Sequence, residues 1–233
     1  MIYVCVVTMN PQNMENIKAF LPAIQQYDAQ LWVFAHGEKV QALRPLANVA
    51  THFISKFRRY GCAEARGKLT QEILGSRAWN DDIFVYLDDD VAIRDNTVDW
   101  LGKLIAPIQS GDADIAGVDG RVIEYRHDEF VTQSVRVTIP DYVSGGWCAV
   151  HRRVFDAGVM FDPDYFPNYW EDVDFCLQAR RKGLRIRRVG DIGLEHYTPS
   201  ITAEMLKQST YTHEIFRLRW TQRMIEVIRE KQE

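Results

Sequence analysis

Three consecutive acids, Asp88, Asp89 and Asp90, follow an apolar run at residues 83–87. Crowded carboxylates repel one another, so such a cluster is unfavourable unless a cation neutralises it. Hard divalent ions such as Mg²⁺ or Mn²⁺ take carboxylate ligands and keep positions for water and for substrate phosphate oxygens. The cluster therefore indicates a metal site for a phosphorylated ligand. An acidic surface loop, or a helix N-cap near Asn96, would use the same residue types, so the cluster alone does not decide.

A second group of acids lies in the stretch NYWEDVDF, residues 168–175. Glu171 and Asp172 open a predicted helix, where the helix dipole favours carboxylates, so capping is one explanation for them. Trp170 precedes them, however, and a carboxylate held against aromatic surface can have a pKa suited to a general base. We expect Asp172 to accept a proton, and Asp174 to be a solvated residue or a helper at the helix N-terminus rather than part of the chemistry.

A histidine in a third segment can complete a metal site. His196 lies in GLEHYTP, residues 193–199, after a predicted strand and a glycine turn. An isolated histidine is more often a hydrogen-bonded packing residue, but imidazole is also a common metal ligand. The sequence leaves both roles open for His196.

The first half of the chain alternates strands and helices, which predicts a mostly parallel sheet with helices on both faces. In such sheets ligands bind beyond the carboxyl ends of the strands, where the acid cluster lies. The helix that begins near Asn10 contains Pro22, which we expect to bend or end it. The predicted strands cover residues 2–8, 31–35, 52–55 and 83–87, and the predicted helices cover 14–24 and 63–74.

The second half has a different pattern. Residues 121–150 are rich in β-branched residues and predict added antiparallel strands. Residues 197–212 have weak periodicity and predict a loop. Other predicted elements are helices at 97–108 and 173–180, strands at 113–118 and 184–189, and an amphipathic C-terminal helix at 213–231. We expect one domain, with one ligand bound by about residues 1–118 and another by about residues 119–233.

Composition indicates a globular enzyme-sized protein without a nucleic-acid signature. The chain has 233 residues, 46% of them hydrophobic, and a formal net charge of −4. Four cysteines lie far apart in apolar surroundings and predict reduced packing residues. With no membrane-length apolar run and no signal peptide, we expect a cytoplasmic protein with no integral membrane segment. A basic cluster at residues 180–188 is expected to be a solvated face, with an anionic acceptor as the alternative.

Taken together, these motifs resemble GT-A-fold glycosyltransferases, specifically glycosyltransferase family 2 and its rhamnosyl- and galactofuranosyl-transferase relatives. The similarity covers nearly the whole chain. Four segments carry it in order: YGCAEARGK at 60–68, YLDDDV at 86–91, SGGWCAVHRRVFDAGVMFDPDYF at 144–166 and YWEDVDFCLQARRKGLRI at 169–186. The second resembles the family's DxD motif, and the last resembles its acceptor-side ED motif.

The resemblance implies a role for each candidate residue. Asp172 is the implied catalytic base, and Trp170 and Glu171 lie on the acceptor side. Asp90 and His196 are the implied ligands of Mn²⁺ or Mg²⁺. The residues expected to bind the donor nucleotide and sugar are Thr8, Arg66, Asp88, Asp89, Gly145, Gly146 and Trp147.

The implied reaction inverts the anomeric centre and uses a nucleoside-diphosphate sugar, with UDP the first expectation. The sequence departs from the family in two places. VFAHGE, residues 33–38, lacks the usual acid beside the nucleotide base, and Gly67 replaces an asparagine. His36 is expected to be a turn residue, with a base contact as its alternative. The 197–212 segment is expected to fold over the donor, as lids do in related enzymes.

Other functions stay open at this stage. A non-catalytic nucleotide- or carbohydrate-binding protein of the same fold would share the motifs. A sugar-phosphate nucleotidyltransferase is expected to have a glycine-rich loop after the first strand, where this chain has VVTMNPQN. A phosphatase is expected to have a DxD motif on the first strand, and this chain has it elsewhere. The acceptor can be a glycan, a lipid-linked sugar, a protein side chain or a nucleobase. The C-terminal helix is expected to pack on the domain or on a second copy, so a homo-oligomer also stays open.

Overall fold

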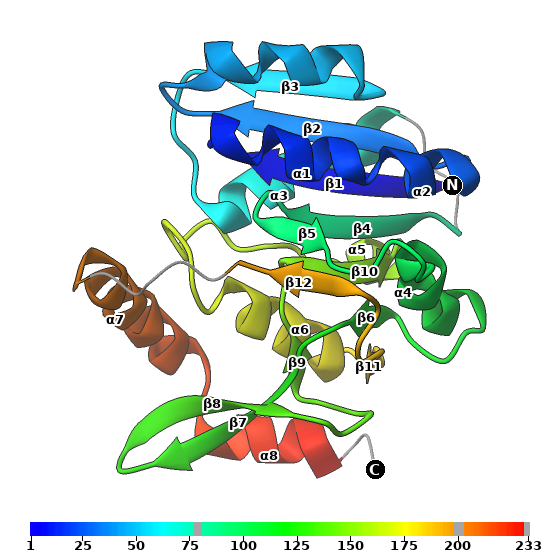
Figure 1. Cartoon of the computed structure of the whole chain (residues 1–233). Helices are drawn as coiled ribbons and strands as arrows, with labels where there is room; N and C mark the ends of the chain where they lie inside the picture. Colours follow the sequence, from blue (N-terminus) through cyan, green and yellow to red (C-terminus); the bar gives the residue numbers. More distant parts are fainter. Residues whose placement is uncertain (77–80, 198–202, 231–233) are drawn as a thin grey trace.

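The computed structural model describes residues 1–76, 81–197 and 203–230 (Figure 1). Its largest element is a seven-stranded sheet with the strand order β11-β6-β10-β4-β1-β2-β3. Only β10 among these strands runs antiparallel to its neighbours. The strands are β1 (Ile2–Thr8), β2 (Gln30–His36), β3 (His52–Lys56), β4 (Ile83–Asp88), β6 (Ile115–Gly117), β10 (Trp147–His151) and β11 (Ile186–Arg188).

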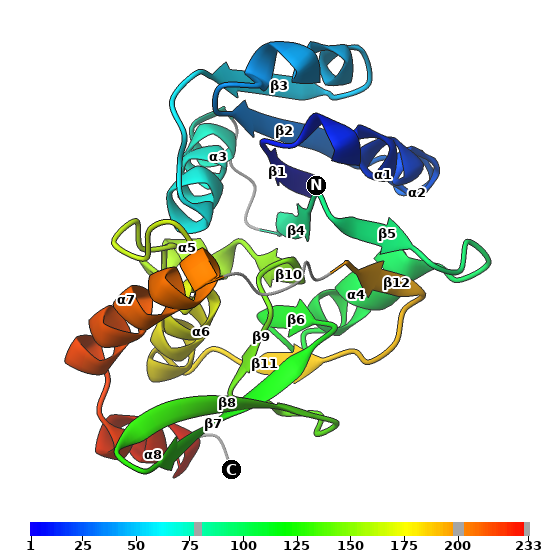
Figure 2. The ribbon, with the colours of Figure 1, turned by 60° about the vertical axis from the view of Figure 1, so that its left-hand side comes forward.

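Helices cover both faces of this sheet, because the central strands are apolar on both sides. In β1, Tyr3 and Cys5 join the core cluster that contains α3, while Val4 and Val6 join the cluster under α1, α2 and α4. Figure 2 shows α3 and α1 on opposite faces. The mostly parallel sheet predicted from the sequence is confirmed. The helices of the first half are α1 (Met14–Ala19), α2 (Leu21–Gln26), α3 (Cys62–Ser76) and α4 (Trp100–Gln109), with 3₁₀ turns η1 (Pro11–Asn13) and η2 (Val40–Asn48).

Local capping signals explain where these helices begin. Asn10 caps the η1 turn by accepting a hydrogen bond from the backbone of Gln12. Pro22 lies in the first turn of α2, and the predicted 14–24 helix is divided at Phe20. Helix α4 begins three residues later than predicted, because Asp99 caps it through the Gly102 amide at 3.0 Å.

The predicted antiparallel strands form a separate three-stranded sheet with the order β8-β7-β9. Its strands are β7 (Gly120–Arg126), β8 (Glu129–Val135) and β9 (Tyr142–Val143). A further two-stranded sheet, which the sequence did not indicate, pairs β5 (Val91–Ile93) with β12 (Leu194–His196). This pairing places the residues that directly follow the acid cluster beside the segment that contains His196.

The C-terminal region differs from the prediction. The prediction of a loop at residues 197–212 is wrong from residue 203 onward, because helix α7 (Ala203–Arg219) occupies that stretch. Residues 198–202 lie outside the described part. Polar residues are tolerated there because the Thr212 hydroxyl returns to the Gln208 and Ser209 carbonyls at 3.1 and 3.2 Å. The predicted 213–231 helix is divided between α7 and α8 (Gln222–Glu230), and residue 231 lies outside the described part.

Two other predictions about side chains have clear outcomes. Cys5, Cys148 and Cys176 are buried packing residues, as predicted, whereas Cys62 is only partly buried. The prediction that Arg180 is solvated is wrong: Arg180 on α6 (Glu171–Arg181) is 5% exposed and its guanidinium contacts the Asp141 carboxylate at 3.2 Å. Helix α5 (Arg153–Asp156) completes the fold. No helix in the described ranges has both the length and the hydrophobicity to cross a membrane.

Candidate active site

The carboxyl ends of β1, β2 and β4 open into a cavity of about 800 Å³. Helices α3, α6 and α7, the three-stranded β8-β7-β9 sheet, the start of β10 and the end of β12 supply its other walls. All the candidate residues predicted from the sequence line this one cavity: Thr8, Arg66, Asp88, Asp89, Asp90, Gly145, Gly146, Trp147, Trp170, Glu171, Asp172 and His196. The structure therefore brings together every predicted residue, which come from six separate segments of the chain.

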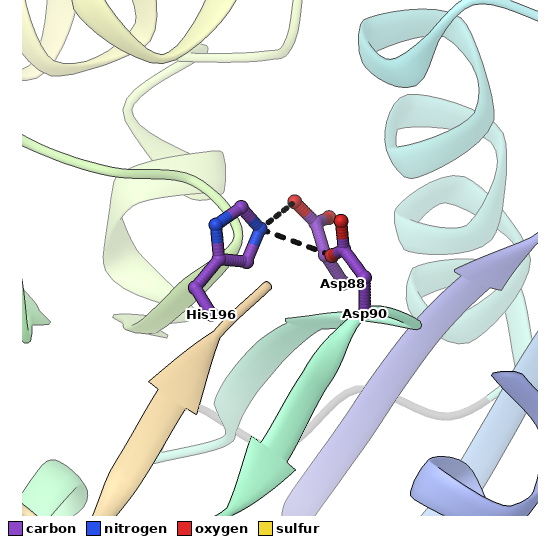
Figure 3. A group of neighbouring side chains, drawn as sticks. All are labelled: Asp88, Asp90 and His196. Atoms are coloured by element: carbon purple, nitrogen blue, oxygen red, sulfur yellow. Dashed lines mark ion pairs between the residues drawn. The ribbon is translucent and has the colours of Figure 1, made fainter. Parts of the chain in front are cut away.

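Asp88, Asp90 and His196 form a compact group of potential metal ligands (Figure 3). His196 Nε2 lies 3.0 Å from Asp90 Oδ1 and 3.8 Å from Asp88 Oδ2. One ligand atom from each residue lies within 4.8 Å of the others. The β5–β12 pairing sets this geometry, because it places His196 opposite Val91. The neighbouring carboxylates of Asp88 and Asp90 raise the pKa of His196 to about 10.

The middle acid, Asp89, points to different partners. Its carboxylate accepts hydrogen bonds from the Thr8 hydroxyl at 2.6 Å and from the Asn13 side chain at 3.0 Å. Its backbone carbonyl accepts a third from the Asn16 side chain at 3.1 Å. Burial raises the pKa of Asp89. Asp89 thus connects the end of β4 to the residues that follow β1. The sequence did not indicate that Asn13 and Asn16 would contact Asp89.

Arg66 on α3 connects the two acidic groups of the cavity. Its guanidinium lies 2.5 Å from Asp88 Oδ1 and 3.3 Å from Glu171 Oε1, and it is 3% exposed. Burial opposes ionisation of Asp88, but the Arg66 and His196 charges hold the pKa of Asp88 well below its usual range. A buried cation shared by two acids keeps both carboxylates in place.

Glu171 and Asp172 begin α6 and line the same cavity. Asp172 accepts hydrogen bonds from the Gly145 amide at 3.3 Å and from the Val173 amide at 2.8 Å. Burial raises the pKa of Asp172, and burial together with the Asp172 charge raises that of Glu171 to about 7. Among the described residues, the buried Glu171 Oε2 has no hydrogen-bond partner. Both carboxylates are therefore suited to receive a proton or a hydroxyl hydrogen bond.

Gly145 and Gly146 lie so close to Arg66 and Asp88 that an added side chain at either position would force a shift. A Cβ atom at Gly146 would lie 2.3 Å from Asp88 Oδ2, and one at Gly145 would lie 2.8 Å from Arg66 Nη1. The Gly146 carbonyl accepts a hydrogen bond from the Asp88 amide at 2.8 Å. These glycines hold the start of β10 against the end of β4. Trp147 follows them and its ring lies 5.8 Å from that of His196.

Helix α7, part of which was predicted to be a loop, forms one wall of the cavity. His213 stacks on Trp170 with the ring centroids 4.6 Å apart and the planes at 20°. Trp170 and Tyr169 both have left-handed backbones, with φ of 66° and 76°. For non-glycine residues such φ values are strained, and strain of this kind gathers at functional sites. From the same helix, Met205, Gln208 and Ser209 line the cavity.

Two minor predictions can be assessed in the same region. Asp174 is not solvated: it is buried in the first turn of α6 and accepts a hydrogen bond from the Trp220 indole at 2.7 Å. His36, expected as a turn residue, instead ends β2 and lines the cavity. Its Nδ1 accepts a hydrogen bond from the Tyr60 amide at 3.2 Å, and burial lowers its pKa to about 4. His36 is therefore neutral at physiological pH.

Comparison with solved structures identifies the architecture. The crystal structure of GalNAc-T7 with UDP, GalNAc and Mn²⁺ matches 92% of this chain with a TM-score of 0.66 at 16% sequence identity. The chain has a GT-A-like fold. It spans 48% of the GalNAc-T7 chain. The inositol-1-phosphate CTP transferase from T. maritima matches 91% of this chain, and 96% of its own, with a TM-score of 0.48 at 8% identity. Comparison with family models and with curated proteins finds no match.

Proposed function

We propose that this GT-A-like protein is an inverting, divalent-metal-dependent glycosyltransferase. It would move a sugar from a nucleoside-diphosphate sugar, with UDP as the first expectation, to an acceptor hydroxyl. The observation that carries the proposal is the convergence of Asp88, Asp90 and His196 in the cavity that also holds Asp172. This arrangement places potential metal ligands and a potential base around one space.

The donor set suits Mn²⁺ or Mg²⁺. Two carboxylates and one imidazole come from two segments, and their ligand atoms are close enough to share one ion. Asp90 and His196 would hold the ion, with Asp88 beside it and braced by Arg66. When bound, the ion would supply positive charge to stabilise the departing nucleoside diphosphate. GalNAc-T7, which has the same fold, was solved with UDP and Mn²⁺, and this supports the same choice here.

Asp172 is the proposed general base. The acceptor oxygen would form a bond to the anomeric carbon of the donor sugar as the bond from that carbon to the diphosphate oxygen breaks. The acceptor proton would pass to the Asp172 carboxylate. Burial raises the pKa of Asp172, which makes the carboxylate a better proton acceptor. One displacement inverts the anomeric centre, so no second carboxylate is needed as a nucleophile.

The division of the chain into two halves follows from this mechanism. Residues 1–118 would bind the donor through the strand ends that carry Thr8 and the acid cluster. Residues 119–233 would bind the acceptor, with Trp170 and Glu171 beside the base. Within this proposal, the resemblance to glycosyltransferase family 2 rests on the motifs of the sequence.

The deciding experiment titrates UDP, dTDP and GDP calorimetrically, each with Mn²⁺ and with EDTA. We expect tight binding of one nucleotide only with metal, followed by turnover of its sugar conjugates. Asp172→Asn should abolish turnover and leave nucleotide binding nearly intact. Asp128→Asn, on the exposed turn between β7 and β8, is the matched control and should change neither. Metal-dependent binding with no turnover of any donor would instead indicate a non-catalytic binding protein.

A further inference from the structure

The small antiparallel sheet forms a polar wall of the same cavity that no sequence motif marked. Asp119, Arg121, Thr132 and Tyr142 all line the cavity from this sheet or its entry. Strand pairing explains their common orientation. Arg121 lies opposite Tyr142, and Thr132 lies opposite Ile123, two residues along the strand from Arg121. Since side chains two residues apart share a face, the strand residues of this wall project to one side.

The wall is held in place by its own hydrogen bonds. Arg121 Nε donates to Asp119 Oδ2 at 2.8 Å, with the two side chains 38% and 25% exposed. Tyr142 is 4% exposed, and its hydroxyl interacts with the Thr132 and Arg121 side chains. Each group therefore has a fixed position, but Asp119 and Arg121 still reach the open space. Preorganised groups of this kind lose little entropy when a ligand binds.

The charge around this wall disfavours an anionic ligand. The Arg121 guanidinium is paired with Asp119, and it also interacts with the nearby Asp172 carboxylate. Glu171 lines the same cavity next to Asp172. A phosphate or carboxylate placed here would meet at least as many negative groups as positive ones, and like charges at close range are unfavourable. The exposed basic residues Arg181, Lys182 and Arg185 do not line the cavity.

We infer that this wall is an acceptor subsite for a neutral polyhydroxylated group, such as the terminal sugar of a glycan. The inference rests on the proposed function. A carboxylate, a guanidinium and two hydroxyls, side by side, offer both acceptors and donors, as sugar hydroxyls require of their partners. Asp119 and Arg121 act as specificity residues: they would hold the sugar ring so that one hydroxyl faces Asp172.

Binding of small glycosides tests this inference separately from the nucleotide site. The probes are methyl glycosides of glucose, galactose and N-acetylglucosamine, which are neutral, and methyl glucuronide, which carries one negative charge. Saturation-transfer NMR and calorimetry give their Kd values with Mn²⁺ and the nucleotide, and again without either. We expect the wild-type protein to bind at least one neutral glycoside and to bind the glucuronide at least about tenfold more weakly.

Two variants in the wall should change this pattern in different ways. Tyr142→Phe removes one hydroxyl and should weaken the neutral glycoside several-fold. Asp119→Asn leaves Arg121 without its counter-charge, so it should weaken the neutral glycoside about tenfold and strengthen the glucuronide. A purely structural role would not produce that reversal. Tyr125→Phe and Asp128→Asn make the same chemical changes on the hairpin outside the cavity and should alter neither Kd.

The outcomes separate the two proposals. If a nucleotide binds with metal, the proposed function stands. The acceptor inference is nevertheless overturned by any one of three results: the glucuronide is preferred, no glycoside binds, or the wall variants behave like their controls. If no nucleotide binds, the proposed function fails. Neutral-glycoside binding that responds to Tyr142→Phe and Asp119→Asn without nucleotide would then still support a glycan site.

Discussion

Replacing Gly146 with alanine is a small change that should disable the group of potential metal ligands formed by Asp88, Asp90 and His196. The added Cβ would lie 2.3 Å from Asp88 Oδ2 and 2.9 Å from its Cγ, whereas ordinary contacts begin at 3.4 Å. Gly146 does not have a left-handed backbone, so the clash is the main cost of the substitution. The Asp88 carboxylate must therefore retreat by about 1 Å, away from the cation it would help to hold.

The expected loss follows from that displacement. A change to a group that orients the ligands of a metal typically costs about 10- to 100-fold in metal affinity. We expect Gly146→Ala to weaken Mn²⁺-dependent nucleotide binding by up to about 100-fold, or about 2.8 kcal/mol at 1.4 kcal/mol per factor of ten. Calorimetric titration of UDP with Mn²⁺, and with EDTA as the reference, measures this difference.

A second glycine provides the control. Gly75 on α3 has no atom within 4 Å of an added Cβ, so Gly75→Ala should keep binding and stabilise the helix by up to about 1 kcal/mol. In an Asp88→Ala background, Gly146→Ala should have little further effect, because the atom it displaces is absent. Wild-type affinity in Gly146→Ala would refute the argument that Asp88 must lie against this backbone.

Three further predictions concern charge. Because the pKa of His196 is raised to about 10, its imidazole is protonated at neutral pH, and Mn²⁺ must displace that proton to bind. The affinity for Mn²⁺ should therefore rise by up to about tenfold per pH unit between pH 6 and 8. Calorimetry in two buffers of different ionisation enthalpy should detect about one proton released per ion, and an affinity that does not change with pH would contradict this prediction. Arg66→Met should destabilise the protein by about 3 kcal/mol in urea unfolding. The loss should be larger at pH 8 than at pH 5, since Glu171 becomes neutral below its pKa of about 7, and an unchanged midpoint would exclude the pairing. Asp141→Asn weakens contacts to Arg229 on α8 and should cost about 2 kcal/mol in the same assay; a loss confined to activity would mean that Asp141 acts at the site instead.

Local patterns were sufficient to predict the central sheet. Strand β1 has the predicted bounds, and β4 ends in the acid cluster as expected. Apolar runs bounded by turn residues indicate such strands because both faces of a parallel sheet are buried. The carboxyl ends of parallel strands meet at one edge, so the approximate place of the ligand site also followed from the sequence.

Long-range pairings were not predictable from residue types. The β5–β12 pair joins short segments about a hundred residues apart, and it alone explains how His196 reaches Asp90. Arg180 belonged to a run of basic residues, and only its contact with Asp141 shows that it is buried. Helix α7 lacked a clear apolar stripe, because its contacts include a histidine stacked on Trp170. In each case the deciding partner is distant in the sequence.

The polar wall of the cavity is built on a sheet that is not hydrogen-bonded to the large one. The β7–β8 hairpin, residues 120–135, carries Arg121 and Thr132, while the potential metal ligands Asp88, Asp90 and His196 lie at the end of β4, in the turn that follows it and on β12. Exchange of this hairpin between proteins of similar architecture would leave the carboxylates and the histidine unchanged. Under the proposed function, such an exchange would change the acceptor that is bound and leave the residues proposed to bind the donor in place, and a protein engineer can attempt it.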